Sequence, residues 1–147
     1  SWDLTRLPDD AIPITNYERA CDKATFASVQ ERWEGRPYTD YYRVAWREMI
    51  PFDTERSLFA SLIPPGPTHV KAVHTLALSS PTKTVLTAGF WSTLPLDYLV
   101  RIMGRSTLYG IREIGAMPTG VTSHPLAAAL IFRTLRLNRT SPMRVSV

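Results

Sequence analysis

The alternation of apolar and polar residues predicts four strands in the middle of the chain. Residues 39–49 alternate with a period of two, which is typical of a strand with one buried face. Residues 56–63 are apolar on both faces and predict a central strand, whereas residues 68–78 alternate again. A Pro-Pro-Gly-Pro turn joins these two segments, so a hairpin is expected there. Residues 82–90 predict a fourth strand, reached by a turn of serines and a proline.

Towards the C-terminus the spacing of the apolar residues becomes helical. Residues 92–104 predict a helix with Ser92 or Thr93 as its N-cap and Pro95 in its first turn. Residues 124–138 predict another helix, with an apolar and a basic side. The apolar side of this helix consists of Leu126, Leu130, Ile131 and Leu135, and the basic side of Arg133, Arg136 and Arg139.

Strands followed by helices indicate an α+β fold, because alternating strand–helix units are missing. We expect a twisted, mainly antiparallel sheet of about four strands with helices packed on it. Residues 1–37 have three prolines and mixed charges, and they predict a lead-in arm with one short helix. Residues 38–147 predict a single domain. Since the chain begins with a serine, we expect an excised piece of a longer protein.

Charge is distributed unevenly along the 147 residues, which carry a net charge of +4. Residues 1–40 contain five basic and eight acidic residues, whereas residues 41–147 contain twelve basic and five acidic ones. Concentrated arginine with aromatic residues nearby suits a polyanion such as nucleic acid, although a solvated basic surface has the same composition. The single cysteine, Cys21, cannot form an internal disulfide and favours a cytoplasmic location. No apolar run is long enough to predict a membrane span.

Motifs that define common enzyme sites are missing from the sequence. There is no glycine-rich loop for nucleotide phosphates and no Gly-x-Ser-x-Gly elbow. His69, His74 and His124 lack the spacing of metal ligands. Of these, His74 is expected in the core, whereas the role of His69 stays open. A binding module is therefore favoured over an independent enzyme, and a small hydrolase with a dispersed site is a weaker alternative.

Two sequence blocks, taken together, resemble a region of a known protein family. The first holds Arg43 and Arg47, the segment 54–58 (Thr-Glu-Arg-Ser-Leu) and an Ile-Pro-Pro-Gly turn. The second holds a Ser-Thr-Leu-Pro-Leu-Asp-Tyr-Leu-Val-Arg helix and the loop 104–110. In this order they resemble the C-terminal part of large bacterial adenine-specific DNA methyltransferases of the type IIG restriction-modification and phage-defence kind. The resemblance covers about residues 38–119.

In that family the region is the target recognition domain, which reads the DNA sequence while a separate domain transfers the methyl group. The resemblance therefore implies double-stranded DNA and a catalytic methyltransferase domain of the same polypeptide as partners, in a bacterial cytoplasm. It implies S-adenosylmethionine as the cofactor of the full-length enzyme and no cofactor in this chain. The chain lacks the Asn/Asp-Pro-Pro-Tyr/Phe catalytic loop of these enzymes. The alternative is a protein-interaction module that docks another domain or subunit.

The candidate DNA contacts are side chains that can hold phosphates or base edges. Arg43 and Arg47 are expected on one strand face about 13 Å apart, or else bonded to carboxylates. His69 and Lys71 are expected on the outward face of the third strand. The loop 104–110 is the strongest candidate, although a helix cap and turn would also explain its glycines. Its candidate side chains are Arg105, Ser106, Thr107 and Tyr109.

Two further arginines are expected to have structural partners. Arg56 follows a turn-like start and is predicted to join that turn to a carboxylate such as Asp97, because both residues lie in the resembling blocks. Arg101 lies four residues after Asp97 in the predicted helix, which predicts a pair within that helix.

Overall fold

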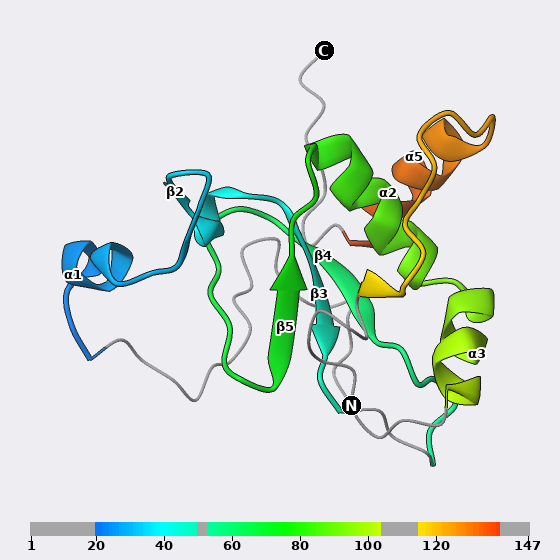
Figure 1. Ribbon diagram of the computed structural model, residues 1–147, viewed down its shortest axis with the longest axis horizontal. Coiled ribbons are helices and arrows are strands. Elements are labelled where there is room, and N and C mark those ends of the chain that lie inside the picture. Colours follow the sequence, from blue (N-terminus) through cyan, green and yellow to red (C-terminus); the bar gives the residue numbers. More distant parts are fainter. Residues whose placement is uncertain (1–19, 50–52, 104–114, 139–147) are drawn as a thin grey trace, which may run out of the picture.

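The computed structural model describes residues 20–49, 53–103 and 115–138, which form two antiparallel sheets and several helices (Figure 1). This arrangement confirms the α+β fold. None of the helices in these ranges is long and apolar enough to span a bilayer. The elements are α1 (Lys23–Ser28), β1 (Arg32–Trp33), β2 (Arg36–Pro37), η1 (Tyr38–Asp40), β3 (Arg43–Arg47), β4 (Ala60–Ile63), β5 (Val73–Leu76), α2 (Pro81–Trp91), α3 (Leu94–Ile102) and α5 (Ala127–Leu137).

The predicted lead-in arm contains a short helix, as expected, and also a small hairpin that the pattern did not indicate. Asp22 caps α1, because its Oδ1 accepts hydrogen bonds from the N–H groups of Ala24 and Thr25. Strands β1 and β2 pair across Glu34 and Gly35, whose φ angles are +50° and +79°. Two positive φ angles are typical of the type I′ turn, which matches the twist of a two-residue hairpin.

The three-stranded sheet has the order β4-β3-β5, and both outer strands are antiparallel to β3. The predicted hairpin between β4 and β5 is therefore wrong, because the two strands run in the same direction on opposite sides of β3. Residues 64–72 carry the chain from one edge of the sheet to the other. The prediction that residues 56–63 form the central strand is also wrong, since β3 occupies that position.

The central position of β3 buries both of its faces, whereas its sequence alternates like a half-buried strand. Val44 and Trp46 belong to the core cluster that α2 covers, and Trp46 meets Trp91 of α2 with ring centroids 5.5 Å apart. Arg43 and Ala45 on the other face are also buried. On this second face Arg43 contacts Pro67 of the crossing segment 64–72 and the ring of Tyr38.

The fourth predicted strand is a helix, α2. Ser80 provides the N-cap, accepting a hydrogen bond from the N–H of Lys83, and Pro81 stands in the first turn, where its missing N–H costs nothing. Six consecutive residues, 84–89, are buried, so this part of the helix is buried on every side, and two of the buried residues are threonines. This burial removes the helical period from the sequence and explains the wrong prediction.

Helices α3 and α5 confirm the two predicted C-terminal helices. Thr93 is the N-cap of α3, and Leu96 and Val100 are its buried apolar residues. In α5 the buried residues are Ala127 and Thr134. The predicted apolar side of α5 is therefore partly wrong, because 66% of Leu126 and 46% of Leu135 are exposed.

Small residues bring α5 close to α2, and the end of α5 reaches the sheet. A methyl group at Gly89 would overlap with the Thr134 hydroxyl, so glycine permits this approach. At the last described residue of α5, Asn138 Oδ1 accepts hydrogen bonds of 2.8 Å from the Leu62 N–H and from the Ser61 hydroxyl. Helix α5 is thus fixed to the outer edge of β4.

Candidate nucleic-acid interface

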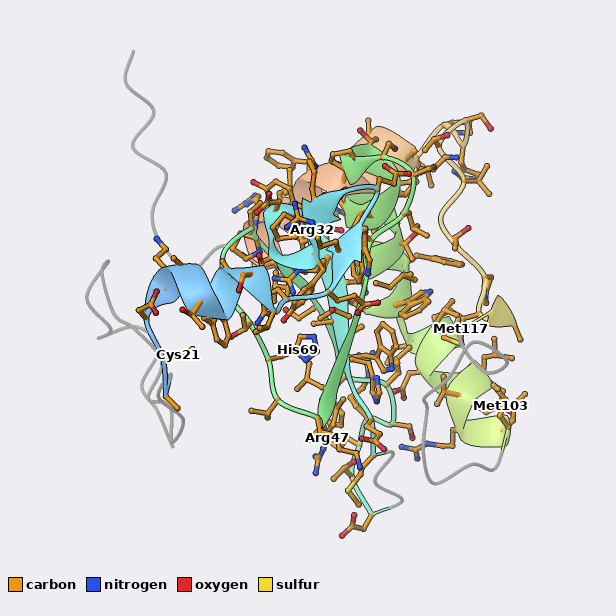
Figure 2. All side chains as sticks on the ribbon, turned by 60° about the vertical axis from the view of Figure 1, so that its left-hand side comes forward. Cys21, Arg32, Arg47, His69, Met103 and Met117 are labelled. Atoms are coloured by element: carbon orange, nitrogen blue, oxygen red, sulfur yellow. The ribbon has the colours of Figure 1, made fainter. Side chains whose placement is uncertain are left out.

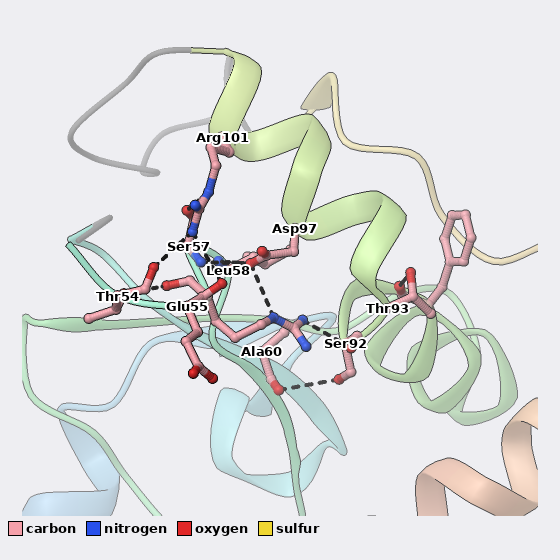
Figure 3. Close-up of polar contacts among 11 residues, drawn as sticks. Thr54, Glu55, Ser57, Leu58, Ala60, Ser92, Thr93, Asp97 and Arg101 are labelled. Atoms are coloured by element: carbon pink, nitrogen blue, oxygen red, sulfur yellow. Dashed lines mark hydrogen bonds and ion pairs between the residues drawn. The ribbon is translucent and has the colours of Figure 1, made fainter. Parts of the chain in front are cut away.

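Asp97 joins the two sequence blocks that carry the resemblance (Figure 3). It lies in the first turn of α3 and is only 5% exposed. Its Oδ1 accepts hydrogen bonds of 2.7 Å from the N–H groups of Ser57 and Leu58 and lies 3.3 Å from Arg56 Nε. Arg56 also donates to the carbonyl of Ser92 at 3.0 Å. The predicted link between Arg56 and Asp97 is confirmed.

The charged form of Asp97 is the stable one in this site. Burial alone would raise the pKa of its carboxyl, but the N–H groups of Leu58 and Ser57 and the Arg56 guanidinium outweigh burial and hold the pKa below its usual range. Two backbone donors and one cation therefore compensate this carboxylate for the loss of water.

Arg101, one turn after Asp97, contacts the same loop from further along α3. Its Nε donates to the Ser57 hydroxyl at 3.1 Å, and its Nη2 donates to the carbonyls of Thr54 and Glu55 at 2.9 and 3.2 Å. The predicted pair between Asp97 and Arg101 is wrong, because Arg101 points at these loop groups (Figure 3). We call Arg56, Ser57, Asp97 and Arg101 the α3 clamp. The residues of the resemblance therefore act here as scaffold.

Arg43 is buried, so the prediction of an exposed strand arginine is wrong. Its side chain donates to the carbonyls of Tyr41 and Pro67, and its guanidinium carbon lies 4.8 Å from the centre of the Tyr38 ring. No part of the residue is exposed. Burial lowers the pKa of Arg43, and Tyr38 opposes this shift. Arg43 holds segment 64–72 over the sheet and leaves no donor at the surface for a phosphate.

Arg47 and Lys71, by contrast, are both exposed and lie at the same end of the sheet. Arg47 ends β3 and is paired with Val73, the first residue of β5. The Glu48 N–H donates to the carbonyl of Ala72 at 3.0 Å, next to Lys71. Figure 2 shows Arg47 at the lower end of the sheet, the end towards which α3 also runs. We call Arg47 and Lys71 the basic end.

His69 and Lys71 precede β5, so their predicted place on a strand face is wrong. The exposed His69 ring contacts the hydroxyl of Thr75, with Nε2 at 3.0 Å, and its ring centroid lies 5.9 Å from that of Tyr38. Beside it, a pocket of about 320 Å³ opens between the hairpin and β5, with Trp33 and Tyr38 in its wall. His69 is thus a surface residue of an aromatic pocket, above the basic end in Figure 2.

His74 is only half-buried, so its predicted place in the core is not reached, because it stands on β5 at the edge of the sheet. Its ring stacks on that of Trp46 with centroids 5.8 Å apart, and Nε2 lies 3.6 Å from the carboxylate of Glu48. The Glu48 carboxylate is thus directed at the His74 ring.

Two exposed arginines on the hairpin, Arg32 and Arg36, were not predicted from the sequence. Arg36 lies over Tyr41, with 4.5 Å from its guanidinium carbon to the ring centroid, and Tyr41 raises the pKa of Arg36. The signal for this hairpin was the pair Glu34 and Gly35 between arginines, which resembles the Asn-Gly and Asp-Gly turns of tight hairpins.

The remaining candidates lie outside the described residues. These are Arg105, Ser106, Thr107 and Tyr109. The last turn of α3 immediately precedes them, and the clamp fixes that turn through Arg101. Across the described ranges, no group of three His, Cys, Asp or Glu side chains is placed to hold a metal ion.

Comparison with other proteins adds no relative. No protein-family model matches the chain, and neither curated proteins nor solved structures give a match.

Proposed function

We propose that this chain is the target recognition domain of an adenine-specific DNA methyltransferase and binds duplex DNA without itself being catalytic. The restriction-modification or phage-defence context comes from the resemblance of the two sequence blocks. S-adenosylmethionine would be held by the separate catalytic domain, since this chain has no motif for it.

The observation that carries the proposal is the distribution of charge after Glu55. In the described residues from 56 onward, six cations accompany a single carboxylate, Asp97, which is buried in the α3 clamp. The surface of this part of the chain therefore has positive charge without an exposed carboxylate among the described residues. A net positive charge of this kind attracts a polyanion, and Lys71 is the cation among these six that lies at the basic end.

The basic end is the place where phosphate contacts are expected first. Arg47 and Lys71 are exposed and project from adjacent segments at the end of the sheet. The segment 104–110 continues from α3, which runs towards the same end in Figure 1. In this arrangement the two cations hold the DNA backbone, and Arg105, Ser106, Thr107 and Tyr109 supply the donors and the aromatic face for base recognition.

Duplex binding can be tested by gel shifts with a pool of randomised duplexes over a range of salt concentrations. The affinity is expected to fall steeply as salt increases, because each phosphate contact releases counterions. A preferred sequence should emerge from the pool. No binding to any duplex at low salt would contradict DNA binding by the chain.

Variants locate the contact surface. Replacing both Arg47 and Lys71 by alanine should weaken binding uniformly across sequences and reduce the salt slope by about 0.9 for each lost contact. Arg105→Ala should lower the affinity and change the preferred sequence. Lys83→Ala is the matched control, because Lys83 is exposed in the first turn of α2, at the opposite end of the molecule. Equal losses for Lys83→Ala and the double variant would exclude the basic end.

A further inference from the structure

A groove lies between α2 and the segment that leads into α5, and neither residue of the basic end lines it. Figure 1 shows these two elements at the upper right of the molecule. Its volume is about 550 Å³, which is within the range of binding clefts in proteins. Most side chains in its wall are apolar, and Arg133 and His124 are its ionisable groups. The apolar wall includes Leu86, Phe90, Val121, Leu126, Ala127 and Leu130.

One flank of α5 extends the apolar surface beyond this groove. Leu126, Leu130, Arg133 and Leu137 follow one another at intervals of four, three and four residues, so they form a single stripe along the helix. The stripe is about 16 Å long at the rise of an α-helix. Leu126 is 66% exposed and Leu137 is 83% exposed. A small ligand in the groove would leave Leu137 uncovered, because this residue does not line the groove.

The helical spacing of the stripe indicates the shape of its occupant. Helices pack along one another through rows of side chains at intervals of three and four residues. An amphipathic helix that enters an apolar groove would cover Leu126, Leu130 and Leu137 together. The length of the stripe corresponds to about three turns of such a helix.

The charges around the stripe indicate the composition of the occupant. Arg133 stands in the middle of the stripe and is exposed. The described residues 115–138 contain no aspartate or glutamate, and α2 contains none either. A second copy of the same surface would be repelled, whereas carboxylates beside the apolar side chains of a partner would pair with Arg133.

We propose that the groove and the leucine stripe of α5 bind an amphipathic helix whose apolar side chains are flanked by aspartate or glutamate. This site is separate from the basic end, because neither Arg47 nor Lys71 lines the groove. The helix belongs to another domain or to another protein, and its carboxylates face Arg133.

The proposal can be tested on the 147-residue chain with a fluorescent synthetic helix that carries leucines at intervals of three and four residues and glutamates elsewhere. Binding followed by fluorescence anisotropy should be saturable. A peptide with lysine in place of glutamate, and one with alanine in place of leucine, should bind at least about tenfold more weakly. Equal binding of the glutamate and lysine peptides would overturn the proposed chemistry.

Two charge reversals on the same helix localise the contact. Arg133→Glu should weaken binding of the glutamate peptide by about tenfold or more. Arg136→Glu is the matched control, since Arg136 is exposed but lies off the stripe, over the ring of Phe132. It should weaken binding clearly less than Arg133→Glu does, because the Arg136 side chain is directed over Phe132 and away from the stripe. Equal effects of the two reversals would show that only net charge attracts the peptide and would overturn the site.

Two further outcomes would also overturn the proposal. If dodecanoate, a small fatty acid, displaced the peptide completely, the groove would be identified as a site for a small amphiphile. Failure of the glutamate peptide to bind at all, with circular dichroism showing a folded chain, would exclude an acidic helix as the occupant.

Discussion

Arginine is fixed in two different ways in this molecule, in the α3 clamp and at Arg43. In the clamp, Arg56 lies 3.3 Å from a buried carboxylate that also accepts two backbone N–H groups. At Arg43, no ion pair with a carboxylate forms among the described residues, and the guanidinium is held by the carbonyls of Tyr41 and Pro67 and by the face of Tyr38. The first arrangement neutralises charge with charge, and the second surrounds a cation with dipoles and an aromatic ring.

The difference shows why one arginine could be assigned from the sequence and the other could not. A carboxylate partner is visible in a sequence as a residue type, and the resemblance of the two blocks then pointed to Asp97. Carbonyl groups belong to every residue, so the sequence carries no sign that Pro67 will meet Arg43. Arg43 and Arg47 lie on the same face of β3, yet Arg43 is buried and Arg47 is exposed. Arg43 meets Pro67 and the ring of Tyr38, and neither partner could be read from the sequence.

Removal of the clamp carboxylate should have the largest effect. Asp97→Ala leaves the N–H groups of Ser57 and Leu58 without their acceptor and Arg56 without its anion, so we expect a loss of about 3–5 kcal/mol in the free energy of unfolding. Urea denaturation measures this loss. Asp53→Ala is the control, because Asp53 is exposed and should change stability by less than about 0.5 kcal/mol. A loss below about 1 kcal/mol for Asp97→Ala would show that the clamp is not a stabilising unit.

Replacing Arg43 should destabilise the protein somewhat less than replacing Asp97. The loss should depend on how much side-chain volume the replacement keeps. Arg43→Ala leaves a cavity and an unsatisfied Pro67 carbonyl, with an expected loss of about 2–4 kcal/mol. Arg43→Met keeps most of the volume without the charge and should be less destabilising than alanine. Arg47→Ala is the exposed control on the same strand. If methionine destabilised as much as alanine, the hydrogen bonds of Arg43, rather than its packing, would dominate.

The smallest effect should be a difference in pH dependence. The folded-state pKa of Asp97 is below its usual value near 4, so the carboxylate stabilises the protein above that pH. This contribution is lost as the pH falls from about 4 through the folded-state pKa. Asp97→Asn keeps an acceptor for the two N–H groups but cannot titrate. The stability of the variant should therefore fall less steeply than that of the unmodified chain below pH 4, and parallel curves would contradict the role of the carboxylate.

Elements with a local sequence signal, such as a capping residue or an alternating pattern, could be predicted from the sequence. Helix α3 has a capping residue and a proline in its first turn, and its predicted bounds agree with the structure. The segments of β3, β4 and β5 were found by alternation or by apolar runs. Their pairing was wrong because strand order depends on where a connection crosses the sheet, and the turn at Pro64 and Pro65 does not encode the direction taken by the residues that follow it.

Helix α2 was predicted as a strand because it is buried on all sides. The groove beside α5 was not predicted because apolar residues of α5 were expected in the core. In neither helix do apolar residues face the core while polar residues face the solvent. The buried residues of α2 include Thr84 and Thr87, and the side of α5 that faces α2 contains Thr134. The leucines assigned to the core of α5 are partly at the surface, which is why the groove could not be foreseen.

The hydrogen bond from the edge of β4 to Asn138 can form only late in the synthesis of the chain. The side chain of Asn138 accepts a hydrogen bond from Leu62, a residue of the sheet edge that precedes it by 76 positions. The ribosome makes β4 long before it makes Asn138. Until α5 emerges, this stretch of the β4 edge has an N–H group open to other strands. The period between the two events is when a nascent chain is most exposed to pairing with its neighbours.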